Sequence, residues 1–283
     1  MMLVETLRRP VPVAMTTIVA LTALGWAVLF SEAISRGGGV NAFLEALCRP
    51  ADILDVRSTA EALTRLASSI GIWIAMSVAM MLPTASLLVI GFADRLEARS
   101  AARSAARSAL AGRSASPLSL AAGYLAVWVA VSIVAATMQA LLSALLASIE
   151  PPAAVATILA GAVIGAAGFY QFSGLKKACL ISIRNPFVAG EGDALANDGA
   201  AFRLGLRQGV SCVGCCGALM GVLVVVGAMN LAWMAIFAAI MAAEKMSASD
   251  RLPRFLGIIM IAAGAALSVS AVGFEALIDA FSR

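Results

Sequence analysis

Histidine is absent from this 283-residue sequence, and charged residues account for only 13% of it. Without histidine the chain cannot hold haem through a histidine ligand, build most catalytic zinc sites or use imidazole for acid–base catalysis. The low charge excludes an ordinary soluble domain, in which about 25% of residues are charged. Any metal ion bound by this chain must therefore use sulfur, carboxylate or backbone oxygen ligands.

Aromatic residues are also scarce, at 6% of the chain, and no dense basic cluster is interleaved with them. Nucleic-acid-binding domains need such basic surfaces, so we expect no nucleic-acid partner. The run Gly37–Gly39 is not followed by Lys-Ser or Lys-Thr, so it is not a phosphate-binding loop. No nucleophile elbow and no paired catalytic carboxylates stand out either. These absences favour a protein that is not an enzyme.

Apolar length is what the sequence has in abundance. It is 61% hydrophobic, with a mean hydropathy of +0.96. A helix of roughly 20 apolar residues crosses a bilayer core about 30 Å thick. Helices are required because lipid offers no hydrogen-bond partner for backbone groups. We therefore predict an all-α, polytopic membrane protein that contacts the lipid bilayer and forms a single domain over residues 1–283.

The apolar runs predict a bundle of about six transmembrane helices. The first run is longer than the roughly 7–15 apolar residues of a signal peptide, so we interpret it as a membrane anchor. Pro83, inside the second run, should kink that helix. Glycines recur along one side of the fourth run and should allow close contact with another helix. The predicted spans lie near residues 11–30, 68–92, 118–148, 153–172, 209–243 and 255–280.

Basic residues predict how this bundle is oriented. The connections 94–117 and 173–207, together with both termini, hold 13 of the 20 Lys and Arg residues. The positive-inside rule assigns the side with more basic residues to the cytoplasm. Six crossings then leave both termini in the cytoplasm and the connection 244–254 on the opposite side.

Three of the five cysteines, Cys212, Cys215 and Cys216, fall within five residues near the start of the fifth predicted span. Residues three and four apart share a face of a helix, so Cys212 should lie next to the other two. Met220 follows Cys216 by four residues and extends the stripe toward the membrane centre. Cys179, in the preceding connection, could fold back onto the cluster. Thiol chemistry usually decides where cysteines are kept, so the cluster is a candidate functional site.

A second stripe of large side chains lies on the second predicted span. Trp73, Met76 and Met80 follow one another at helical spacing. If this stripe faced the cysteines, the two spans would form a sulfur-lined path with Met80 as a candidate ligand. Methionine is also common filler in apolar cores, so packing is the alternative interpretation of the methionines.

These ligand types predict copper as the bound metal. Thiolate and thioether groups select Cu(I), and the reducing cytoplasm would keep the cysteines as thiols. A tetrahedral zinc site needs four ligands, but adjacent cysteines should point about 100° apart on a helix, which makes four-way closure harder. Cu(I) is satisfied by about two or three sulfurs. The predicted metal ligands are Cys179, Cys212, Cys215, Cys216, Met220 and Met80.

Several strings stand out in combination: Ala79–Pro83, Lys176–Leu180 with Arg184 and Pro186, Cys212–Cys216 with Leu219–Met220, Gly227, Met229–Asn230, Trp233–Met234 and Glu244–Lys245. Between about Trp73 and Lys245, the chain resembles a bacterial family of integral membrane proteins predicted to bind metal, a domain of unknown function described in some members as a copper chaperone. The resemblance implies a multi-pass protein of the bacterial inner membrane, with a membrane protein or a metallochaperone as partner. Two candidate ligands of the family pattern are replaced, by Ser182 and Ile183, and a tryptophan of that pattern is replaced by Gly217.

The sequence leaves two other functions open. Cys212 and Cys215 form a C-x-x-C pair, which can be redox active when its first thiol lies at a helix N-terminus. A membrane thiol oxidoreductase of this kind should face the oxidising side, whereas the basic residues put the pair on the inside. The glycine-lined fourth span and the departures from the family pattern instead allow a non-catalytic subunit that packs against a membrane partner.

Overall fold

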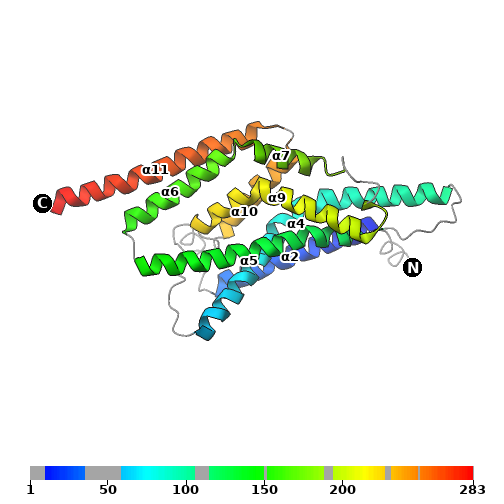
Figure 1. Ribbon diagram of the computed structural model, residues 1–283, viewed down its shortest axis with the longest axis horizontal. Coiled ribbons are helices and arrows are strands. Elements are labelled where there is room, and N and C mark those ends of the chain that lie inside the picture. The colour runs from blue at the N-terminus through cyan, green and yellow to red at the C-terminus, as the bar shows by residue number, and fades with distance from the viewer. Residues whose placement is uncertain are drawn as a thin grey trace. The chain divides into compact units, whose positions relative to one another are not determined.

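The computed structural model describes residues 10–35, 59–105, 115–149, 152–187, 194–226, 231–247 and 249–282. Every element assigned within these ranges is a helix, which confirms the predicted all-α class. Eight helices are described (Figure 1): α2 (Pro10–Ser35), α4 (Thr59–Ala105), α5 (Pro117–Ile149), α6 (Ala153–Tyr170), α7 (Gly174–Arg184), α9 (Asp198–Val226), α10 (Leu231–Met246) and α11 (Arg251–Ser282).

Most of these helices are long and apolar. By length and composition, five of those in the described residues could cross a membrane, or six if the bent pair α6 and α7 is counted as one span. The five candidate spans are Val11–Glu32, Leu63–Ala102, Pro117–Leu145, Asp198–Leu223 and Arg251–Val272. The sequence predicted about six such helices, and their number agrees with that prediction.

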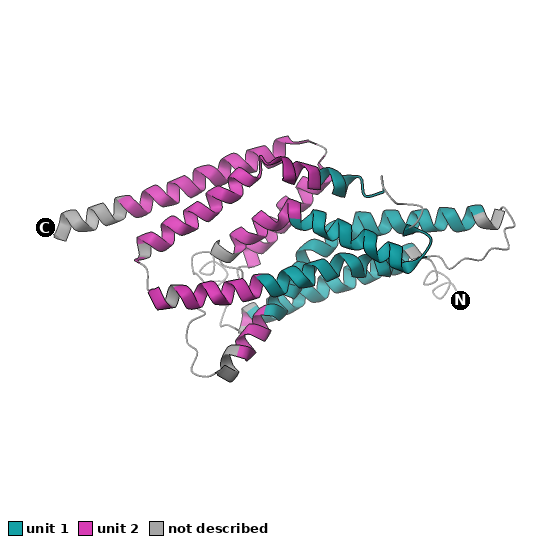
Figure 2. Ribbon diagram, in the orientation of Figure 1, with its two compact units in different colours: residues 1–32, 70–134, 180–213 teal, residues 33–69, 135–179, 214–283 magenta. Residues whose placement is uncertain are grey.

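The chain divides into two compact units (Figure 2). Unit 1 comprises residues 1–32, 70–134 and 180–213, and unit 2 comprises residues 33–69, 135–179 and 214–283. Helices α2, α4, α5, α7 and α9 contribute residues to both units. Each unit therefore draws on segments from the whole sequence. The single domain over residues 1–283 stays a prediction.

Unit 1 has a core of apolar side chains from α2, α4, α5 and α9. At one edge of it, the Asp198 carboxylate accepts hydrogen bonds from the Ser116 backbone N–H at 2.7 Å and the Ser119 hydroxyl at 2.8 Å. These bonds join the start of α9 to the start of α5, and the two helices then run in the same direction. The core includes Ala14, Ile18, Leu82, Val89, Phe92, Leu96, Leu120, Ala201 and Leu204.

Unit 2 contains a close antiparallel pair, α6 and α11. A Cβ on Gly161 would lie 2.6 Å from the Gly264 carbonyl oxygen, and a Cβ on Gly168 would lie 2.9 Å from that of Gly257. Only glycine permits this approach, since real Cβ atoms essentially never come so near a backbone oxygen. The glycines on the fourth predicted span therefore do allow close helix contact, as predicted.

The antiparallel pairing of α6 and α11 differs from the predicted path. In six consecutive crossings, the fourth and sixth spans would run in the same direction. The difference arises in residues 209–243, predicted as one span, which the structure divides between α9, ending at Val226, and α10, beginning at Leu231. The intervening residues 227–230 lie outside the described residues. A further helix in the path reverses the direction of every helix that follows it.

Within unit 2, α9 and α10 run out from α7 and back to it. The Tyr170 hydroxyl, just before α7, donates a hydrogen bond to the Gly214 carbonyl on α9 at 2.5 Å. Near the other end of the out-and-back pair, Lys176 of α7 is 2.8 Å from the carboxylate of Glu244 on α10. The chain thus leaves the neighbourhood of α7 at Gly214 and returns to it at Glu244.

The connections 173–207 and 244–254, predicted on opposite sides of a membrane, therefore meet at one end of unit 2. An ion pair between Lys177 and Asp250, 2.7 Å apart, joins them a second time. Sequence counting could not find this arrangement, because it treated residues 209–243 as a single straight helix.

Helix α7 lies in a stretch predicted as a polar connection. Its axis is bent by 59° from that of α6. The Ser173 hydroxyl accepts a hydrogen bond from the Lys176 backbone N–H at 3.1 Å, which is typical of an N-cap residue. Lys176 and Cys179 are three residues apart and share one face of this short helix. The cap therefore fixes the start of α7, and with it the positions of Lys176 and Cys179 along the helix.

Candidate metal centre

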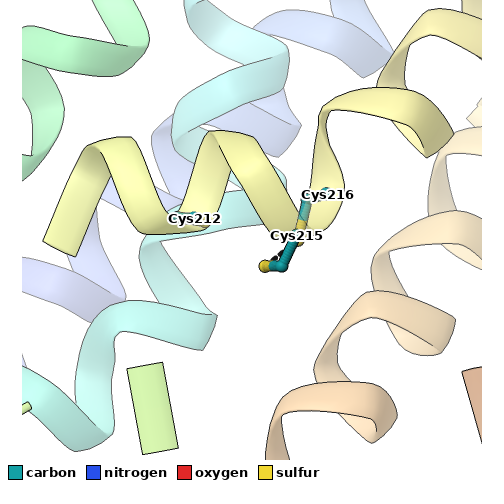
Figure 3. A group of neighbouring side chains, drawn as sticks. All are labelled: Cys212, Cys215 and Cys216. Atoms are coloured by element: carbon teal, nitrogen blue, oxygen red, sulfur yellow. Dashed lines mark hydrogen bonds between the residues drawn. The ribbon is translucent and has the colours of Figure 1, made fainter. Parts of the chain in front are cut away.

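Three thiols gather near the middle of helix α9. The sulfur atoms of Cys212, Cys215 and Cys216 all lie within 4.8 Å of one another, and each residue is 1% exposed. Figure 3 shows the three residues on one continuous helix. Their mutual distances therefore follow from helical spacing and side-chain rotation alone, and the predicted shared face is present. We refer to them as the thiol triangle.

The adjacent cysteines are closer than their spacing suggested. Successive residues on a helix point about 100° apart, which predicted that Cys215 and Cys216 would diverge. Their sulfurs are instead 3.1 Å apart (Figure 3). Rotation about χ1 can turn two neighbouring side chains toward each other even when their Cα–Cβ bonds diverge. Both residues, like Cys179 and Cys212, carry thiols rather than disulfides.

The thiol triangle has the dimensions of a single-ion site. A bond from a thiolate to a metal such as zinc is about 2.3 Å long, so one ion can bridge sulfurs up to about 4.6 Å apart. Sulfurs within 4.8 Å of one another need only small side-chain rotations to meet that limit. Three thiolates and no imidazole are a soft ligand set, which suits Cu(I).

In unit 1, a hydroxyl and a thioether lie against the sulfur of Cys212. The Tyr124 hydroxyl donates a hydrogen bond to it at 2.9 Å, and the Met81 thioether lies 3.9 Å from it. The same hydroxyl is 3.4 Å from the Met81 carbonyl oxygen, a longer and weaker contact. Tyr124 is 3% exposed and Met81 is fully buried. A hydrogen bond donated to a thiolate offsets part of its negative charge.

Glycines bring Tyr124 close to Cys212. Helices α5 and α9 approach so closely that a Cβ on Gly123 would overlap the Phe202 backbone, and one on Gly205 would overlap the Leu120 backbone. Because the helices run in the same direction at this distance, the long Tyr124 side chain spans the remaining gap to the Cys212 sulfur. The contact between Tyr124 and Cys212 therefore depends on Gly123 and Gly205, although neither glycine has a side chain that could bind a metal.

In unit 2, Cys179 lies against α9 beside the cysteine pair. A Cβ on Gly214 would overlap the Cys179 sulfur, so this glycine leaves the space that the thiol occupies. Gly214 directly precedes Cys215 in the sequence. Tyr170, which donates a hydrogen bond to the Gly214 carbonyl, also lies near Cys179, Cys215 and Cys216. Cys179 is partly exposed, whereas the thiol triangle is buried.

The other residues predicted from the sequence have varied positions. Met220 lies one turn beyond Cys216 and is 4% exposed, and Met80 on α4 is 1% exposed. Their roles as ligands stay predictions. Ser182 accepts a hydrogen bond at 3.1 Å from Ser211, the residue before Cys212. Cys48 lies outside the described residues.

Sequence reasoning missed Met81 and Tyr124. It chose Met80 because Trp73, Met76 and Met80 share one face, but the methionine in contact with Cys212 is its neighbour Met81. Neighbouring residues point about 100° apart on a helix, so the choice depended on which face of α4 meets α9. The Gly123–Tyr124 pair, next to a glycine-containing face on α9, was the signal available in the sequence.

A protein-family model described as "PpoB2: Copper chaperone" matches residues 70–267 of the chain. This range covers more than two thirds of the chain and contains Cys179, the thiol triangle, Met80, Met81 and Met220. No curated protein and no solved structure is similar enough to the chain to be matched to it.

Proposed function

Because the chain belongs to the PpoB2 copper chaperone family, we propose that it is an integral membrane protein that binds Cu(I) as cargo and hands it to a partner protein. The observation that carries this proposal is the buried thiol triangle of Cys212, Cys215 and Cys216. A chain without histidine offers a soft ion only sulfur ligands, and thiolates select Cu(I). The family description supports copper over other soft ions.

The thiol triangle holds Cu(I) through about two or three of its sulfurs. Met81 adds a neutral thioether on the side of Cys212, and Tyr124 donates a hydrogen bond to the Cys212 sulfur. Both neighbours suit a monovalent soft ion bound by thiolates, since neither adds further negative charge. A tetrahedral zinc site would need a fourth strong ligand.

Cys179 is the thiol through which Cu(I) enters and leaves. It is partly exposed and lies beside Gly214, whereas the thiol triangle is 1% exposed. A partner protein with its own thiol or thioether ligands can reach Cys179 first and then exchange the ion with the buried sulfurs. The partner is therefore a copper-carrying protein at the membrane or a soluble metallochaperone.

The membrane path that these contacts support is a revision of six simple crossings. Since α9 and α10 run out from α7 and back, α11 starts on the side where α7 lies and ends on the other side. Of the 20 basic residues, 15 then lie on the cytoplasmic side of the inner membrane, compared with 13 for six crossings. The proposed path keeps the N-terminus in the cytoplasm and moves the C-terminus to the opposite side.

This path is tested with single cysteines and an impermeant thiol reagent applied to intact cells. In a variant that lacks the native cysteines, Ser282→Cys should be labelled and Ser249→Cys should be protected. Labelling of Ser249→Cys alone would contradict the revised path and favour the one with six crossings.

Copper binding is tested by metal analysis of the full-length protein, purified under reducing conditions and loaded with Cu(I). A variant with Cys212, Cys215 and Cys216 changed to Ser should lose its bound copper almost completely, because the hydroxyl oxygen is a hard ligand. The matched control is Ser211→Ala with Ser182→Ala, which changes polar side chains beside the cluster and leaves its sulfurs in place. Equal copper in the triple variant and the unaltered protein would disprove the proposal, and co-purification of a metal-free protein with a stable partner would favour the non-catalytic subunit.

A further inference from the structure

Unit 2 contains a buried ion pair that the copper site does not use. The Lys176 ammonium lies 2.9 Å and 2.8 Å from the two carboxylate oxygens of Glu244, and both side chains are 1% exposed. The side-chain oxygen of Gln171 also accepts a hydrogen bond from Lys176, and Gln171 is 4% exposed. These polar contacts of the ammonium group are all with protein groups in the interior of unit 2.

Such a pair is costly to build, so its position matters. Taking two charges out of water costs several kcal/mol per ion, and this cost is recovered only with good geometry and additional hydrogen bonds. The adjacent Lys177 offers the natural comparison. It pairs with Asp250 at 2.7 Å, but the two side chains are 58% and 37% exposed, and exposed pairs contribute little. Two neighbouring lysines thus form ion pairs of very different consequence.

The buried pair joins α7 to α10 about one helical turn from Cys179, the thiol through which Cu(I) is proposed to enter and leave. Lys176 and Cys179 are three residues apart on α7, which separates them by about 4.5 Å along the helix axis. Cys179 in turn occupies the space left by Gly214 on α9. Because α7 has only 11 residues, fixing it at Lys176 also fixes the position of Cys179.

We propose that Lys176 and Glu244 are positioning residues, whose buried ion pair holds α7 so that the Cys179 thiol stays on Gly214 and can exchange Cu(I) with the thiol triangle. The positioning of Cys179 is argued from the geometry alone. Its role in Cu(I) exchange rests on the proposed function. Neither side chain touches the ion. Their effect is therefore on the rate at which copper is handed over, rather than on the amount bound.

The test uses Glu244→Gln in the full-length protein, held in detergent micelles. The metal-free protein is treated with N-ethylmaleimide, and modification of each cysteine is followed by mass spectrometry. We expect Cys179 to react about tenfold faster than in the unaltered protein, because release of α7 exposes its thiol more fully to the reagent, while the three buried cysteines stay protected. Lys177→Met, which breaks only the exposed pair, should leave the reactivity of Cys179 unchanged.

A second measurement follows copper itself. The protein is loaded with Cu(I), and transfer to the chelator bathocuproine disulfonate is timed. Glu244→Gln should slow the transfer of Cu(I) to the chelator about tenfold and leave the amount of copper bound at equilibrium unchanged. General loosening of the fold would instead lower the amount of copper bound as well. Glu244→Asp keeps the charge and shortens the side chain, so it provides the same comparison if the Gln variant does not fold.

The outcomes separate this inference from the proposed function. If Glu244→Gln and Glu244→Asp leave the reactivity of Cys179 as it is, the positioning role is wrong. If all four thiols become reactive together, the pair stabilises the whole of unit 2 and does not position Cys179, which also overturns the inference. If the protein binds no copper but Cys179 responds alone, the proposed function has failed while the positioning role stands.

Discussion

The two ends of the thiol triangle have different surroundings. Cys212 is enclosed in unit 1 by a hydrogen-bond donor and a thioether, from Tyr124 and Met81, both of them buried. Beside Cys215 and Cys216, unit 2 supplies a further thiol, Cys179, which is partly exposed. The groups around Cys212 can therefore strengthen the binding of an ion. The thiol of Cys179 can instead take the place of one of the ion's ligands.

A carrier of Cu(I) needs both properties. Tight binding by buried thiolates protects the ion from water and from other reagents, but it makes release slow unless an incoming ligand can reach the site. Ligand exchange through an accessible thiol solves this without weakening the resting site. The contrast between the two ends predicts that substitutions near Cys212 change affinity, whereas substitutions near Cys179 change rate.

Among single substitutions that keep all four thiols, Tyr124→Phe is expected to change the affinity most. The variant removes the hydroxyl that donates to Cys212 and keeps the ring, and loss of a second-sphere hydrogen bond should weaken Cu(I) binding about tenfold. Competition with a chelator of known affinity measures the change. Ser132→Ala on the same helix, which breaks the buried bond to Ser77, is the control and should leave affinity unchanged. Equal affinities for Tyr124→Phe and the unaltered protein would contradict the asymmetry.

A smaller effect is expected from Met81→Leu. Leucine fills a similar volume but offers no thioether, so Cu(I) binding should weaken about threefold, or roughly 0.6 kcal/mol. Met80→Leu is the matched control, since Met80 is the neighbouring residue and equally buried. The same competition assay decides between them. A loss confined to Met80→Leu would restore the ligand chosen from the sequence and remove Met81 from the site.

The smallest effect on affinity, and the clearest effect on rate, is expected from Gly214→Ala. The added methyl group would overlap the Cys179 sulfur and force it away from α9. Affinity should change less than about twofold, whereas transfer to a chelator should slow about fivefold. Gly221→Ala is the control on the same helix, because a Cβ there meets nothing within 4 Å. Identical transfer rates for the two variants would show that Cys179 takes no part in exchange.

Patterns within one helix could be predicted from the sequence. Apolar length gave the all-α class and the number of long helices, and the spacing of Cys212, Cys215 and Cys216 gave their shared face. Small residues on α6 gave its close packing with another helix. Each of these depends on the 3.6-residue period of a helix and on local composition, which the sequence contains directly.

Relations between helices could not be predicted in the same way. Whether Met80 or Met81 meets Cys212 depends on the rotation of α4 against α9, and a difference of one residue changes the direction by about 100°. The division of residues 209–243 into two helices was hidden because both parts are apolar. Once that division was missed, the contact between Lys176 and Glu244 could not be anticipated.

The ion pair between Lys176 and Glu244 joins residues 68 positions apart in the chain. A ribosome adds about 5–20 residues per second, so the lysine is synthesised several seconds before its counter-ion. Burying an unpaired ammonium group costs several kcal/mol, so α7 is expected to take its buried position only after α10 has been made. Unit 2 should therefore close late in synthesis, when the carboxylate of Glu244 becomes available.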